Sequence, residues 1–84
     1  MSHINFESVS GRAVKAEYDL PAASEIVVVN QTSNVPLDSP KTPAANAATV
    51  TITVPASAAA GQYFLRAQDA SGGFIAQSVT FFIS

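Results

Sequence analysis

The residues that could carry catalysis in this chain are few and far apart. It holds one histidine, His3, and no cysteine. A Ser-His-Asp or Cys-His mechanism needs a histidine in contact with a nucleophile and with a third group that orients it. A lone histidine beside a chain terminus is usually solvated, so we expect His3 on the surface without a catalytic role.

Carboxylates are the other groups that could do chemistry. Glu17 and Asp19 share the polar face of one alternating segment, which is typical of a solvated strand face. A glycosidase instead needs two carboxylates across a cleft, one of them with a raised pKa. A calcium site could draw on four acidic residues: Glu17, Asp19, Asp38 and Asp69. Their spacing fits neither an EF-hand nor an Asp-rich loop, so we predict no enzyme, no metal and no cofactor.

One short motif indicates a covalent modification. Asn30, Gln31 and Thr32 form an N-glycosylation sequon. Such a triplet arises readily by chance in a chain rich in Ser and Thr, and it is used only in a eukaryotic secretory pathway. Asn30 is therefore a candidate glycosylation site.

Length and charge restrict the function classes. The 84 residues make one domain, residues 1–84. Four basic residues oppose six acidic ones, and the cations are scattered, so no basic stripe is available for nucleic acid. No apolar stretch approaches the roughly 20 residues of a membrane span, and the first residues lack the pattern of a secretory signal. We predict neither a nucleic-acid partner nor a membrane span.

Alternating polar and apolar residues predict strands along most of the chain. The expected strands are 4–8, 12–20, 25–31, 48–55, 62–69 and 74–83. Residues 33–48 hold three prolines, which predicts a long connection or a ragged sheet edge. Several short strands with turn signals between them predict an antiparallel β-sandwich of six to seven strands, Ig-like or fibronectin-III-like.

The apolar phase of these strands predicts the core. Its expected members are Val14, Ala16, Tyr18, Leu20, Ile26, Val28, Val50, Ile52, Val54, Tyr63, Leu65, Phe81 and Ile83. Residues 56–60 are expected to form a helical turn that Gly61 ends. We expect the Tyr63 hydroxyl to bond to backbone in this turn, as in the tyrosine corner of Ig-like sandwiches.

The last hairpin decides which side chains face solvent. If Tyr63 and Leu65 point inward together with Phe81 and Ile83, the loop between the last two strands must have three or five residues. Phe82 then lies opposite Gln62.

In that register Phe64 and Phe82 are diagonal neighbours on the outer face, flanked by Arg66 and Gln68. The alternative is a slip or bulge that turns one phenylalanine inward. An exposed apolar pair of this kind is typical of a ligand site or a self-association surface.

The C-terminal half resembles a known family. It is similar to the Ig-like domain of fungal cell-wall synthesis, found in β-1,6-glucan assembly proteins and in Ser/Thr-rich GPI-anchored proteins. The resemblance rests on Val54-Pro55, Gly61, Tyr63, Arg66, Asp69, Ser71-Gly72, Gln77-Ser78, Phe81 and Ile83. Tyr18 stands where the family usually has a tryptophan. The resemblance implies an Ig-like fold, a cell-wall polymer as ligand, and an extracellular or cell-surface location, with the cytoplasm left open because no leader is seen.

Two functions follow as hypotheses. The first is a non-catalytic binding or adhesion module for carbohydrate or a cell-wall polymer. The second is a structural or assembly protein that forms homo-oligomers through an exposed sheet face. Both assign the contact to the face around Phe64, Arg66, Gln68 and Phe82, with a glycan polymer or a second copy of the chain as partner.

Overall fold

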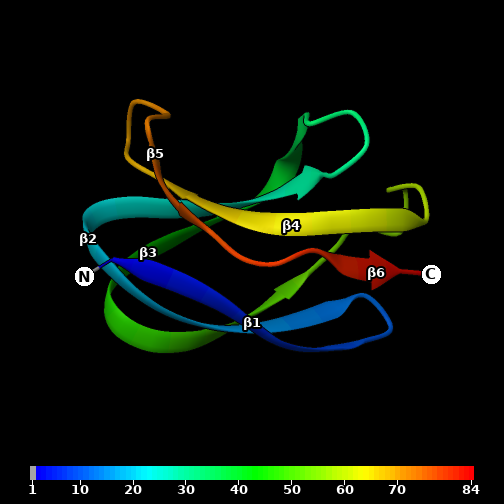
Figure 1. The fold of residues 1–84 in the computed structure, drawn as a ribbon, viewed down its shortest axis with the longest axis horizontal. Coiled ribbons are helices and arrows are strands. Elements are labelled where there is room, and N and C mark those ends of the chain that lie inside the picture. Colours follow the sequence, from blue (N-terminus) through cyan, green and yellow to red (C-terminus); the bar gives the residue numbers. More distant parts are fainter. Residues whose placement is uncertain (1) are drawn as a thin grey trace.

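The computed structural model describes residues 2–84, with all side chains in that range except those of residues 38–42 and 44. The described chain is all-β, without a helix, and its strands pair antiparallel in one curled sheet (Figure 1). The strands are β1 (His3–Ser10), β2 (Ala13–Asn30), β3 (Pro36–Thr53), β4 (Gly61–Gln68), β5 (Phe74–Gln77) and β6 (Phe81–Ile83). The expectation of an antiparallel all-β fold is confirmed.

The strand β2 runs through both halves of the sheet. Its first half pairs with β1 on one side and with the end of β3 on the other. Its second half pairs with the start of β3 and with β4, which in turn pairs with β5 and β6. The two predicted strands 12–20 and 25–31 are thus one bent strand.

The bend in β2 lies between Leu20 and Ser24, where the register with β3 shifts. Ala23 takes a positive φ of 64° there, and the buried Ser24 hydroxyl donates to the Pro21 carbonyl at 2.6 Å. The bend turns the second half of the sheet over the first, and β1 comes to lie against β4, β5 and β6. The core fills the space between the two halves.

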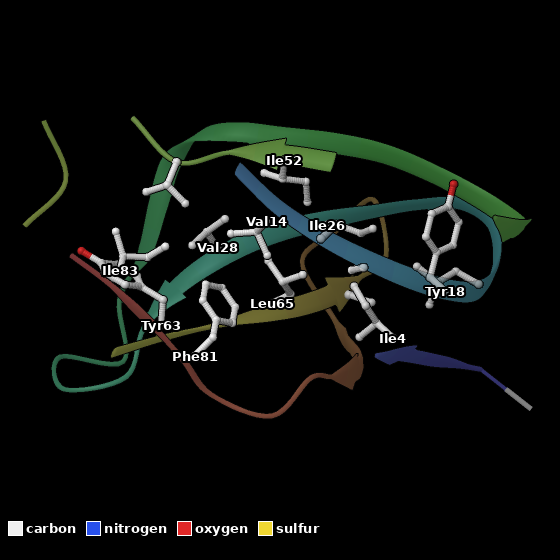
Figure 2. Close-up of a cluster of buried hydrophobic side chains, with 14 residues drawn as sticks. Ile4, Val14, Tyr18, Ile26, Val28, Ile52, Tyr63, Leu65, Phe81 and Ile83 are labelled. Atoms are coloured by element: carbon white, nitrogen blue, oxygen red, sulfur yellow. The ribbon is translucent and has the colours of Figure 1, made fainter. Parts of the chain in front are cut away.

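The core matches the predicted alternation closely. Twelve of the thirteen expected members are buried, and the thirteenth, Val50, is half-buried against the others. Ile4 of β1 and Ala67 of β4 join them. In Figure 2 the labelled side chains from β1, β2, β3, β4 and β6 converge on a common interior. The inward phase of each strand follows from strict period-2 alternation.

The proline-rich segment is strand rather than connection. Of the two alternatives for residues 33–48, the sheet edge is the one observed, because β3 starts at Pro36 and pairs only with β2 among the described strands. Pro36 and Pro43 lie opposite Val29 and Glu25. The Gln31 N–H donates to β4. Backbone hydrogen-bonding groups alternate sides along a strand, so the N–H and C=O of Val29 and Glu25 also point to β4 and away from β3. Neither proline therefore lies where its nitrogen would have to donate to β2. This is the usual arrangement of a proline on an edge strand.

The expected helical turn after β3 is a single hydrogen-bonded turn. The Ala58 N–H donates to the Pro55 carbonyl at 3.0 Å, and no helix follows. The chain then enters β4 at Gly61, whose φ of 151° is a conformation that residues with a side chain rarely adopt.

Candidate interaction surface

The last two strands, β5 and β6, carry the most exposed phenylalanines. Phe82 of β6 is 60% exposed and lies directly opposite Gln62 of β4, as the hairpin parity predicted. Phe74, at the start of β5, is 63% exposed. Val79, in the connection between β5 and β6, is also exposed. These three residues, Phe74, Val79 and Phe82, are spread along β4, from opposite Gln68 to opposite Gln62, and are together called the last-strand patch below.

The predicted exposure of Phe64 is wrong. Phe64 does lie on the outer face of β4, but only 6% of it is accessible. It is opposite Val29 of β2 and forms a second small cluster with Val27 and Val29. The run of three valines puts apolar side chains on both faces of β2, so the outer face at this point is apolar and Phe64 packs against it. The Phe64/Phe82 pair is therefore not a solvent-exposed patch.

The two polar residues expected beside this patch bond to each other instead. The Arg66 guanidinium donates to Gln68 Oε1 at 2.9 Å, and Gln68 Nε2 donates to Glu25 Oε1 at 2.7 Å. Gln68 is buried, which corrects its expected exposure, and Arg66 is half-buried. The Arg66 Nε is buried without a hydrogen-bond partner in the described part of the chain. These side chains cover the outer cluster, and Gln68 offers little surface to a ligand.

The exposure of Val79 arises from a bulge that sequence alternation missed. β5 and β6 pair with β4 in different registers. At the junction Ser78 turns inward, its N–H donates to the Leu65 carbonyl at 2.9 Å, and its hydroxyl accepts from the Leu65 N–H at 3.0 Å. A hydroxyl here replaces one backbone carbonyl of the ladder, and the chain shifts outward at Val79. A small polar residue inside an apolar strand, Ser78, is the signal that could have indicated the break.

The predicted partner of Tyr63 is found. Its hydroxyl donates to the Ala59 carbonyl at 2.5 Å, inside the 56–61 turn. Arg12 reaches the same turn from the β1–β2 connection, and its Nη1 donates to the Pro55 and Ala58 carbonyls at 2.8 Å each. Two side chains, one from β4 and one from the β1–β2 connection, thus hold this turn. Gly61 and Tyr63 have a structural role here.

The loop of the last hairpin has five residues, one of the two predicted lengths. Asp69 organises it: Oδ1 accepts from the backbone N–H groups of Ser71 and Gly73 and from the Ser71 hydroxyl, at 2.8–2.9 Å. The Gly73 N–H, followed by the Ser71 hydroxyl, holds the pKa of the Asp69 carboxyl below its ordinary value. The three hydrogen bonds to Asp69 Oδ1 all come from residues of this loop.

His3 is on the surface, but it has a partner that the sequence analysis did not foresee. His3 is paired with Asp19 in the β1–β2 register, which puts its ring diagonal to Glu17. His3 Nε2 lies 2.8 Å from Glu17 Oε2, and Asn5 Nδ2 donates to Glu17 Oε1 at 3.2 Å. The His3 contact, more than that of Asn5, holds the pKa of Glu17 below its ordinary value. A lowered pKa suits a surface ion pair and is the opposite of what a general acid requires.

The structure gives no sign of a metal centre in its described part. No group of three His, Cys, Asp or Glu side chains comes together there. The side chain of Asp38, one of the four calcium candidates, lies outside the described residues. No described helix could cross a membrane.

The Asn30 sequon lies in the turn between β2 and β3. Asn30 Oδ1 accepts from the backbone N–H groups of Thr32 and Ser33 at 2.9 and 3.0 Å. Gln31 and Thr32 are exposed, while Asn30 is half-buried. Its use as a glycosylation site stays a prediction.

Comparison with known proteins finds no family model, no curated protein and no solved structure that matches this chain. The assignment of a role therefore rests on the residues and contacts described above.

Proposed function

We propose that this protein is a non-catalytic interaction module, built on an Ig-like β-sandwich, that binds its partner through the last-strand patch. The observation that carries the proposal is the exposure of Phe82 of β6 and Phe74 of β5, on strands that both pair with β4. Exposed phenylalanines on a sheet lower solubility, and exposed apolar surface of this kind is typical of binding sites.

The first partner class is a carbohydrate or cell-wall polymer. The exposed ring of Phe82 lies opposite the exposed amide of Gln62. A flat aromatic ring for the apolar face of a sugar, beside an amide for its hydroxyls, is the combination that a glycan site uses. The resemblance to the fungal cell-wall domain supports the same ligand class and an extracellular location.

The second candidate is assembly of copies of this chain, and a separate observation favours it. From Gly72 to Ser84 the chain contains no charged residue. Two identical strands of this kind meet without like-charge repulsion, whereas charged residues are what natural sheets place on an edge to prevent such contacts.

A glycan array combined with light scattering tests the proposal. Wild type and Phe82→Ser are compared, with Thr49→Ser, a conservative change at an exposed position on β3, as the control. We expect a glycan signal or a concentration-dependent mass for wild type, lost in Phe82→Ser and kept in the control. If wild type is a monomer at every concentration and gives no glycan signal, or if Phe82→Ser matches wild type in both assays, the patch has no binding function.

A further inference from the structure

The strand β6 is paired on one side only. It pairs with β4, and among the described strands none pairs with its other edge. β1 approaches β6 through the stacked rings of Phe6 and Phe81 rather than through a ladder. The free edge of β6 is short, because the junction around Ser78 and Val79 separates it from β5.

The register shows which backbone groups occupy this edge. The Gln31 N–H donates to the Gln62 carbonyl at 2.9 Å, so the backbone groups of Gln62 point to β2 and away from β6. In an antiparallel ladder this makes Gln62 and Phe82 a non-hydrogen-bonded pair. The N–H and C=O of Phe82 therefore point away from β4, and one residue presents a donor, an acceptor and a 60% exposed ring.

We propose that β6 pairs with β6 of a second copy, antiparallel, about a two-fold axis at Phe82. This inference rests on the proposed function, because it names the partner of the same patch. In this arrangement each Phe82 N–H donates to the Phe82 carbonyl of the partner copy, so that the two outward groups are satisfied at once by an identical residue. The two Phe82 rings lie side by side on the same face.

Charge supports a second copy as the occupant. The pairing brings residues 80–84 of each copy together, and none of them has a charged side chain. An isologous contact needs a self-complementary surface, and a neutral strand with one central outward residue meets that condition. The contact is short and well below the roughly 1,000 Å² that a stable interface buries, so the dimer is weak and depends on concentration.

A single cysteine tests this geometry cleanly, since the chain has none of its own. Directly opposed residues of a hydrogen-bonded antiparallel pair have Cα atoms about 5.5 Å apart, within the range that a disulfide spans. Phe82→Cys is compared with Thr49→Cys, at the exposed β3 position that also served as the control above. Under mild oxidation we expect Phe82→Cys to form a linked dimer about tenfold faster or more, because the dimer holds the two thiols together.

Two results overturn the inference. One is equal cross-linking rates for the two variants, which means random collision. The other is no linked Phe82→Cys dimer while circular dichroism shows a folded chain. If Phe82→Ser abolishes a glycan signal and Phe82→Cys does not cross-link, the interaction module stands and its partner is not a second copy.

Phe82→Pro provides an independent readout. Besides the exposed ring, proline removes a backbone N–H that points away from β4, so the β4–β6 ladder is kept. We expect sedimentation velocity to show a rise in mean mass with concentration for wild type and no rise for Phe82→Pro. A rise that persists in folded Phe82→Pro would contradict pairing at this edge.

Discussion

Phe6 of β1 and Phe81 of β6 stack with ring centroids 4.9 Å apart and planes 10° from parallel. The two strands share no ladder, so this contact joins the first and last strands of the fold through side chains alone. It also fixes the phase of β6, because Phe81 turned inward leaves its neighbour Phe82 turned outward. The core and the proposed interaction surface are thus set by two consecutive phenylalanines.

The two phenylalanines of the predicted pair should differ sharply in their effect on stability. Phe64→Ala removes a buried ring and should lower the free energy of unfolding by about 3–5 kcal/mol. Phe82→Ala removes an exposed ring and should change it by less than about 0.5 kcal/mol. Urea unfolding measures both. If Phe64→Ala does not fold, Phe64→Leu should show a smaller loss in the same direction, and equal effects at the two positions would show that Phe64 is not buried.

Removal of the Tyr63 hydroxyl should weaken the 56–61 turn. Tyr63→Phe loses the hydrogen bond to Ala59 and should lower the free energy of unfolding by about 0.5–1.5 kcal/mol. Tyr18→Phe, at the opposite end of the core (Figure 2), is the matched control and should have a smaller effect. An unchanged denaturation midpoint for Tyr63→Phe would mean that the bond contributes nothing net.

The effect of a side chain at position 73 on stability should depend on Asp69. A Cβ on Gly73 would lie 2.6 Å from Asp69 Oδ2, so Gly73→Ala must displace a carboxylate that accepts three hydrogen bonds. We expect Gly73→Ala to destabilise wild type but to have almost no further effect in an Asp69→Ala background. Thermal unfolding of wild type, the two single variants and the double variant gives the coupling free energy between the two positions. Strictly additive changes would argue against this steric conflict.

The His3–Glu17 contact predicts a stability change in the acid range. The pKa of Glu17 is lowered in the folded chain from its ordinary 4.5, so its ionised form contributes stability above that value. The contribution is lost as the pH falls below 4.5 through the folded pKa. Carboxyl NMR titration should show the midpoint of Glu17 rise more in His3→Ala than in Asn5→Ala, because His3 is the larger cause. The reverse order would contradict the assignment.

Sequence alternation was sufficient for the core. Val14, Leu65 and Ile83 are buried as predicted because each lies on one phase of a strictly alternating strand. The inward side chains of β4 and β6 followed from requiring both strands to face the same core, but Gln68 pairs with Phe74 and Gln62 with Phe82, so the register shifts between the loop and β6 in a way that alternation did not predict.

Features that depend on tertiary pairing could not be predicted in the same way. Phe64 was assigned to solvent because period 2 identifies the face of a strand but not what covers that face. The cover comes from Val27 and Val29, distant in sequence and brought alongside by β2–β4 pairing. The continuation of β3 through its prolines depends on which side of Pro36 and Pro43 the partner lies, and composition does not contain that information.

The continuity of β2 through both halves of the sheet has a consequence for folding. Neither half holds a complete set of strands of its own, since β2 and β3 each contribute to both. The halves therefore cannot come apart and persist separately, and loss of pairing along β2 removes the support of every other strand except the β4–β5–β6 ladders. The domain should melt in one cooperative transition, and its slowest-exchanging amides should be those in the two stretches of β2 that have a paired strand on both sides, around Val14 and Ile26.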